Sequence, residues 1–277
     1  MSKSNPGELH SKPARAPSLL EFVTCNLAPV LITAKLYISG FPPALLDQLR
    51  HPNPINWINP FHWKRLIFAN GFGAVLKTAD EMYVDVKRPL LQSAYGRVLE
   101  IGAGAGDSVG HYDEAKIERL FCLEPYEPLR RQLVAKLQAV GLAGKSTVIA
   151  AGLDADSRPK LVQAGIEPGS LDTVVLFQVL CSIPDPKAHL KYLQSLLKPG
   201  GQIILFEHVA SKHTLARLIQ NLWAPIWSFN FGGCKLNRDS GDWLSAIGGW
   251  KHVEIQRPLY ETSADLFPHA IGRLIKA

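Results

Sequence analysis

Three glycines at alternate positions follow an acidic residue in the stretch VLEIGAGAG, residues 98–106. The acid is Glu100, and the three glycines are Gly102, Gly104 and Gly106. A glycine-rich turn after a strand commonly binds a nucleotide, because the bare backbone can approach the ligand closely. The dinucleotide pattern G-x-G-x-x-G fails in both registers, since Asp107 and Val109 stand where its third glycine is required. The turn therefore predicts a nucleotide site that does not cradle a pyrophosphate.

Two carboxylates indicate the charge of the ligand. Glu100 lies at the end of the strand before the glycines, where it would repel a phosphate and attract a cation. Glu124 ends the next apolar run, RLFCLE, at the place where an acid binds both ribose hydroxyls and rejects a 2′-phosphate. S-adenosylmethionine fits both conditions, because it carries a sulfonium and an ammonium and no phosphate. We therefore predict S-adenosylmethionine as the cofactor.

Short apolar runs alternate with helical segments from residue 96 to the end of the chain. The predicted strands are 97–101, 119–124, 147–151, 172–179, 202–208, 251–257 and 269–276. Continuous apolar strands that alternate with helices indicate a parallel sheet covered on both faces. The last two strands read as a hairpin at one edge. The predicted fold is α/β, a doubly wound and mostly parallel seven-stranded Rossmann-like sheet with an N-terminal helical extension.

The chain divides into three predicted regions: a disordered tail over 1–17, a helical extension or lid over 18–95, and a catalytic domain over 96–277. The stretch 51–63 holds three prolines and is predicted to be irregular.

Residues 18–46 are strongly apolar and raise the question of a membrane. Glu21 and Lys35 bound an uncharged run of only 13 residues with Pro29 inside it, and a pair of prolines ends the next run. A spanning helix needs about 20 apolar residues. We therefore predict that 18–46 covers the cleft or makes peripheral contact with a membrane surface without crossing it.

The composition narrows the class of protein. The net charge of +6 is spread along the chain and gives no basic patch for nucleic acid, so no nucleic-acid partner is predicted. The cysteines show no C-x-x-C spacing, so no metal site is predicted either; they are Cys25, Cys122, Cys181 and Cys234. The absence of disulfide density favours the cytoplasm, either free or peripheral to an intracellular membrane.

Several segments together resemble one known family. They are LKPGGQIILFEHV (197–209), VIAAG (148–152), VLCSI (179–183), GCKLNR (233–238) and PHAIGRLIK (268–276). With the glycine turn they resemble the class I S-adenosylmethionine-dependent methyltransferases, and most of all the methyltransferase-like 7 group of alkyl thiol methyltransferases. The resemblance covers about 97–277 and implies the fold, the cofactor and a methyl-transfer activity. Members of that group have a membrane-associating N-terminus.

The resemblance also implies which residues contact the cofactor. The three glycines would approach the methionine part and the ribose, and Glu124 would bind the ribose hydroxyls. The residues implied near the adenine are Gly152, Leu153 and Asp154, and those implied along the methyl-donor cleft are Gln178 and Val179.

Methyl transfer is an in-line displacement on an activated donor, so the protein mainly aligns the reactants. A base is needed only when the acceptor is protonated at the working pH. We predict His208 as that base, because it ends the fifth strand, and ligands of open parallel sheets lie at the carboxyl ends of strands. His111 and His213 are weaker alternatives, and Cys234 reads as a packed turn residue.

A cluster of aromatic residues predicts an apolar acceptor pocket; its members are Trp223, Trp227, Phe229 and Phe231, with Trp57 and Trp63 as lid residues. The leading prediction is a methyltransferase for a small lipophilic acceptor, either a thiol or a phenol or carboxylate of a secondary metabolite.

One alternative is a nucleic-acid methyltransferase, although the segment after the fourth strand, QVLCSIPDP, lacks the loop such enzymes use. Others are a nicotinamide-dependent reductase and a non-catalytic scaffold with the same fold.

Overall fold

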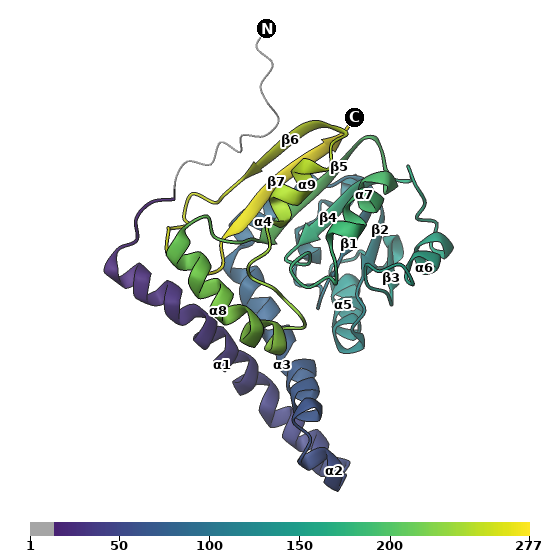
Figure 1. Cartoon of the computed structure of the whole chain (residues 1–277). Helices are drawn as coiled ribbons and strands as arrows, with labels where there is room; N and C mark the ends of the chain where they lie inside the picture. Colours follow the sequence, from purple (N-terminus) through teal and green to yellow (C-terminus); the bar gives the residue numbers. More distant parts are fainter. Residues whose placement is uncertain (1–13) are drawn as a thin grey trace.

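The computed structural model describes residues 14–277, and most of the predicted tail therefore lies outside the described residues. Seven strands form one sheet in the order β3-β2-β1-β4-β5-β7-β6 (Figure 1). Their bounds are β1 Gly96–Ile101, β2 Ile117–Leu123, β3 Ser146–Ile149, β4 Leu171–Phe177, β5 Leu197–His208, β6 Trp250–Gln256 and β7 His269–Lys276. The first five strands pair in parallel, and β7 pairs antiparallel with both β5 and β6. The predicted sheet and its edge hairpin are confirmed.

Both faces of the sheet are apolar and covered by helices. Along β4, Val174 and Leu176 pack into one apolar cluster, while Val175 and Phe177 pack into the cluster on the opposite face. This alternation follows from the two-residue period of a strand. Helices therefore lie on both sides, as the continuous apolar strands predicted.

The helices within the described residues have the following bounds: α1 Leu19–Arg50, α2 Pro54–Trp57, α3 Pro60–Met82, α4 Val84–Gln92, α5 Glu127–Ala139, α6 Arg158–Gln163, α7 Lys187–Leu196, α8 Thr214–Asn230 and α9 Ser240–Ala246. Side chains of α6, α7 and α9 enter one apolar cluster of the sheet, and those of α4 and α5 enter the other. Three short 3-10 helices complete the set: η1 Val109–His111, η2 Glu114–Lys116 and η3 Ala143–Lys145.

The N-terminal helix α1 is continuous through its three prolines, which are Pro29, Pro42 and Pro43. We expected these prolines to interrupt the segment, because each removes a helical hydrogen bond, and that expectation is wrong. Tertiary packing offsets the loss. A Cβ atom on Gly40 would collide with the carbonyl oxygen of Ile67, and one on Gly71 would collide with that of Leu36, so α1 and α3 are in backbone contact.

Two of the three prolines of the segment 51–63, Pro54 and Pro60, start helices rather than break them. Asn53 caps α2 and Asn59 caps α3 through side-chain oxygens, and a proline occupies the first position of each helix. Proline suits this position, because the first amide of a helix has no intrahelical acceptor in any case. The predicted irregular stretch is therefore mostly helical.

Most of α1 lies on the surface, and Figure 1 shows it extending beyond the sheet with α3 beside it. Its buried residues are Pro29, Leu36, Gly40, Ala44 and Gln48, and large apolar side chains such as Leu31 and Ile38 are exposed. By length and composition alone, this helix is able to cross a membrane. The argument from short uncharged runs therefore fails, while the prediction of a surface location stays a prediction.

Candidate active site

A cavity of about 560 Å3 opens at the carboxyl ends of β1, β2 and β4. The chain leaves β1 toward β2 on one side, and β4 lies on the other, so the connections diverge here and leave room for a ligand. Nine of the predicted cofactor residues line the cavity: Glu100, Gly102, Gly104, Glu124, Gly152, Leu153, Asp154, Gln178 and Val179. Gly106 is not among the lining residues. A Cβ atom there would lie 2.8 Å from Cδ1 of Leu133, so Gly106 allows α5 to pack closely.

The glycine turn adopts a backbone that other residues rarely accept. Gly102, Gly104 and Gly106 have φ values of 68°, 58° and 77°. A Cβ atom on Gly102 would lie 2.5 Å from Cγ2 of Val179, which belongs to the opposite wall. Glycine is therefore required at this position both by conformation and by space.

The carboxylate of Glu124 is buried and organises the turn. Its Oε2 accepts the amide of Gly104 at 2.9 Å, and its Oε1 accepts the amide of Tyr126 at 2.8 Å. Burial raises the pKa of Glu124, and the two amide bonds oppose that shift. Each oxygen keeps a lone pair, so the group can still accept hydrogen bonds from a diol in the cavity.

Glu100 lies deeper at the same edge of the sheet. Burial raises its pKa to about 7, while the hydrogen bond donated by the Tyr112 hydroxyl, 2.8 Å away, lowers it. The group thus changes charge near neutrality and would be held ionised by a bound cation.

The wall after β4 is fixed by the strand beside it. Gln178 has a φ of 53° and donates its amide to the carbonyl of Phe206 at 2.7 Å. The fully buried carboxylate of Glu207 accepts the amides of Val179 and Leu180 at 2.9 and 3.1 Å. The segment VLCSI (179–183) therefore meets the end of the segment LKPGGQIILFEHV (197–209), whose Glu207 holds it in place.

The aromatic cover of the cavity comes chiefly from α3. Phe68, Phe72 and Leu76 line it at four-residue spacing, together with Phe231 from the loop after α8. The sequence reasoning missed the α3 residues, although a shared helix face was readable from their spacing.

Only Phe231 among the four predicted acceptor residues lines the cavity. Trp227 is buried in an apolar cluster with Leu36 and stacks on Phe231, the ring centroids lying 3.9 Å apart. Trp223 and Phe229 also lie away from the lining. Trp57 and Trp63 contact each other in the N-terminal helices and do not line it either.

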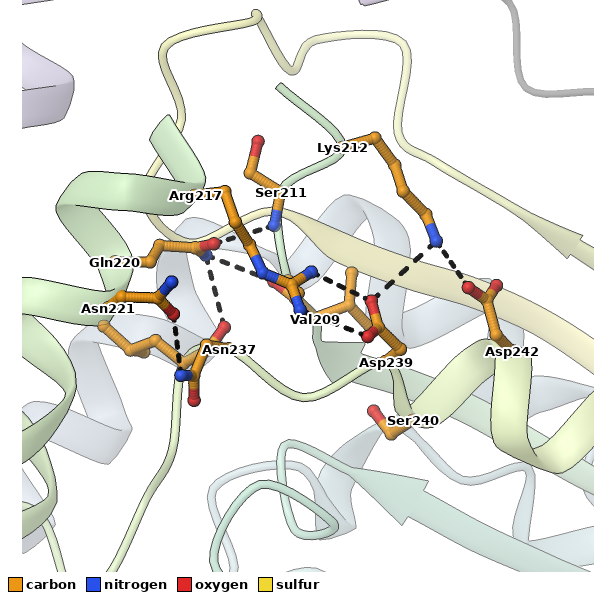
Figure 2. Close-up of polar contacts among 12 residues, drawn as sticks. Val209, Ser211, Lys212, Arg217, Gln220, Asn221, Asn237, Asp239, Ser240 and Asp242 are labelled. Carbon is orange, nitrogen blue, oxygen red and sulfur yellow. Dashed lines mark hydrogen bonds and ion pairs between the residues drawn. The ribbon is translucent and has the colours of Figure 1, made fainter. Parts of the chain in front are cut away.

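The anchoring of α8 explains this placement (Figure 2). The fully buried side chain of Gln220 accepts the amide of Ser211 at 2.7 Å. Its Nε2 donates to the carbonyls of Val209, Leu236 and Leu266. Arg217 pairs with Asp239 at 3.2 Å on the same side. These bonds hold α8 against the end of β5, and the two lining residues of this region, Phe231 and Gly232, follow the helix.

His208 lies behind the cavity rather than in its wall. Its Nε2 is 3.0 Å from Nε2 of Gln178, which also lies 3.4 Å from Nε2 of His269. The base role of His208 stays a prediction.

Neither alternative base lines the cavity. His213 is the N-cap residue of α8. Nε2 of His111 donates to Oδ2 of Asp80, 2.9 Å away.

A polar network that the sequence did not suggest lines part of the cavity. Asp80 accepts the hydroxyl of Ser108 at 2.8 Å and lies 3.4 Å from the buried Lys87. Burial alone would raise the pKa of Asp80, but Lys87, Ser108 and His111 lower it. Asp80 therefore faces the cavity as a carboxylate. Its partners come from different elements, so no local motif marks it.

Comparison with known proteins agrees with this geometry. A family model described as a methyltransferase domain matches residues 77–245. The human thiol S-methyltransferase TMT1B is 30% identical over 202 residues, which cover 71% of this chain and 77% of the relative. The human thiol S-methyltransferase TMT1A is 30% identical over 184 residues, covering 65% and 70%.

Among solved structures, an O-methyltransferase family protein from Burkholderia thailandensis aligns with a TM-score of 0.56 at 14% identity. The alignment covers 90% of this chain and 71% of that one. This likeness supports the fold alone. The family predicted from the sequence is confirmed by the match over 77–245 and by the human relatives: the chain belongs to the S-adenosylmethionine-dependent methyltransferases.

Proposed function

We propose that S-adenosylmethionine binds in the cavity with its ribose at Glu124 and its methionine ammonium near Glu100. The glycine turn lies between these two carboxylates and lets the ligand approach the backbone. The adenine lies beside Gly152, Leu153 and Asp154, which line the far wall after β3. The opposite charges of site and ligand support this placement. Glu100 and Glu124 flank the glycine turn, and their carboxylates would attract a cationic nucleoside.

We propose a small lipophilic thiol as the acceptor. The observation that carries this proposal is the aromatic cover of Phe68, Phe72 and Phe231, which gives an apolar site next to the cofactor cavity. The names of the human relatives support a thiol in particular. The acceptor sulfur attacks the methyl carbon, a carbon–sulfur bond forms, and the sulfonium–methyl bond breaks to leave S-adenosylhomocysteine. The thiol proton passes to solvent.

This reaction needs little base catalysis. A thiol has a pKa of about 8.5, so a thiolate fraction exists near neutral pH, and alignment supplies most of the rate. The placement of His208 behind the cavity fits an acceptor of this kind. A phenol or a carboxylate of a secondary metabolite is the second choice of acceptor.

The test is a matched set of acceptors with the same alkyl or aryl group and a thiol, hydroxyl, carboxylate or amine, incubated with radiolabelled S-adenosylmethionine. We expect label in the thioether product and little in the others. Label only in the phenol ether or the ester would overturn the thiol choice. Binding of S-adenosylhomocysteine without transfer to any acceptor would favour the scaffold alternative.

Cofactor binding is expected to depend on pH through Glu100. The pKa of Glu100 is about 7 in its buried position, whereas a bound ammonium favours its ionised form. Affinity for S-adenosylhomocysteine should therefore fall below pH 7, by up to about tenfold per pH unit. Titration calorimetry between pH 5.5 and 7.5 measures this dependence. Glu100→Gln should bind more weakly and show a flat profile, while the exposed Glu114→Gln should behave as wild type; an equally steep slope in Glu100→Gln would contradict the assignment.

We also propose that α1 lies on the cytoplasmic surface of an intracellular membrane. Its exposed apolar residues include Leu27, Val30 and Leu31, and Leu218 and Leu222 of the neighbouring α8 are exposed as well. Fractionation of cells that express the full chain measures the attachment. We expect release by alkaline carbonate. Protein that resists both carbonate and high salt would show a true span instead.

A further inference from the structure

Three metal-ligand side chains meet directly behind the cavity wall. Cys181 lies in the turn after β4, His208 ends β5, and Cys234 lies in the loop after α8. One ligand atom of each lies within 4.8 Å of the other two. The two sulfur atoms are 3.2 Å apart, although 53 positions separate the cysteines in the chain. No local spacing marks the cluster, so a metal site could not be predicted from the sequence.

The donor atoms of this cluster make only weak hydrogen bonds or none, since the thiols contact each other at 3.2 Å and Cys181 contacts the carbonyl of Gln178 at 3.4 Å. Both cysteines are buried free thiols. Nδ1 of His208 is buried and has no hydrogen-bond partner among the described residues. A buried imidazole nitrogen without a partner is unusual, because such atoms are normally satisfied. A cation between the three side chains would satisfy it.

The backbone around the cluster is held rigidly by other residues. Glu207 binds the amides of Val179 and Leu180, and Arg238 donates to the carbonyls of Leu180 and Ile183. The amide of Lys235 donates to the carbonyl of Cys181 at 2.9 Å, which ties together the two segments that carry the cysteines. The backbone that carries the ligands is thus positioned before any ion arrives, as a specific metal site requires.

We propose that Cys181, Cys234 and His208 bind one Zn²⁺ ion. Two thiolates and a neutral imidazole balance the charge of the ion, so the buried complex is neutral. On binding, two zinc–sulfur bonds form and the two thiol protons pass to solvent. Tetrahedral zinc, with bonds of about 2.3 Å to sulfur, requires the sulfurs to separate slightly by side-chain rotation. Three protein ligands leave a fourth position for water.

The ion would be linked to the cavity through Gln178. An imidazole that coordinates through Nδ1 carries its proton on Nε2, and it donates this proton to an outer partner. The side-chain amide of Gln178, which lines the cavity, lies at Nε2 of His208 and can turn its oxygen toward it. In this role His208 holds the metal and does not act as the base. The inference stands apart from the identity of the acceptor.

The first test measures metal in the full chain, purified without chelator, reconstituted with Zn²⁺ and dialysed. Elemental mass spectrometry should find about one zinc per chain in wild type and in Cys122→Ala. Cys122 is a matched control, because it is a buried free cysteine in another apolar cluster. Cys181→Ala, Cys234→Ala and His208→Ala should each lose most of the metal. Wild type without zinc, or variants that retain all of it, would overturn the proposal.

The second test needs no variant and so does not depend on the folding of one. Titration of metal-free wild type with Co²⁺ should produce a thiolate-to-cobalt charge-transfer band that saturates at one equivalent and disappears on addition of Zn²⁺. A protein that binds S-adenosylhomocysteine but shows no such band is folded and lacks the site. A peptide map of the protein as purified that finds Cys181 and Cys234 joined as a disulfide, with two hydrogens fewer, would also contradict it.

Discussion

Glu124→Ala is expected to weaken binding of S-adenosylhomocysteine by about 1.5–3 kcal/mol, or roughly 10- to 150-fold. The substitution removes the proposed hydrogen bonds to the ribose. It also leaves the amides of Gly104 and Tyr126, which the carboxylate now accepts, without partners. Titration calorimetry gives the affinity. The control is Glu127→Ala, three positions further on, because Glu127 is exposed and pairs with Arg131 at the surface.

The two contributions of Glu124 can be separated by the ligand. A 2′,3′-dideoxy analogue of S-adenosylhomocysteine lacks the hydroxyls that Glu124 is proposed to bind. It should bind wild type more weakly than the parent compound, and Glu124→Ala should discriminate little between the two. If the variant still preferred the parent compound as strongly as wild type does, the ribose would lie elsewhere, and Glu124 would serve only to shape the glycine turn.

Gly102→Val is expected to abolish measurable cofactor binding, with a loss of at least about 100-fold in affinity. A positive φ costs a β-branched residue on the order of 1–3 kcal/mol, and φ at Gly102 is 68°. A Cβ atom would lie 2.5 Å from Cγ2 of Val179, so the opposite wall must move as well. Calorimetry and thermal unfolding together report the loss of binding and of stability.

The space and the conformation at Gly102 can be tested apart. Gly102→Ala combined with Val179→Ala removes the Cγ2 contact and leaves only the backbone strain, so the pair should bind better than Gly102→Ala alone. Gly144→Val is the matched control, because Gly144 has no neighbour within 4 Å of a Cβ atom and no positive φ. Full affinity in Gly102→Val would show that the ligand avoids this turn.

The sheet could be predicted because its signal is local. Each strand from β1 to β5 holds a continuous apolar run, and such a run is buried on both faces in a parallel sheet. The glycine turn was equally readable, since a positive φ leaves glycine as the residue of choice. The location of Glu100 and Glu124 beside this turn could be predicted from their positions at the ends of the first two strands.

The cover of the site could not be predicted in the same way. The prolines of α1 signalled interruption, but close packing against α3 outweighed them. The helix starts within 51–63 are marked by Asn53 and Asn59, but these residues indicate a helix only if they are interpreted as N-caps. The location of the tryptophans of α8 could not be predicted for a different reason. Their residue type predicted apolar contacts, but the orientation of α8, which its anchoring bonds set, determines that Trp227 packs in the core and does not line the cavity.

The Asp80 network and the cysteine pair could not be predicted from the sequence for one common reason. Asp80 finds its partners in α4 and in the turn after β1, and Cys181 meets Cys234 across 53 positions. Spacing within a segment carries no information about such contacts. They arise from the topology, which brings the ends of distant segments to one edge of the sheet.

The packing of α1 on α3 ties the unfolding of the N-terminal helices to that of the rest of the chain, because both helices enter a common apolar cluster. Leu36 of α1 and Ile67 of α3 share an apolar cluster with Trp227 and Phe231, so the extension and the domain have part of their core in common. A shared core unfolds cooperatively. Deletion of α1 would expose apolar side chains next to the cavity, because α1 is not an independent segment. Shortened forms of this enzyme should therefore aggregate, and detergent or lipid that covers α1 should protect the whole molecule against heat.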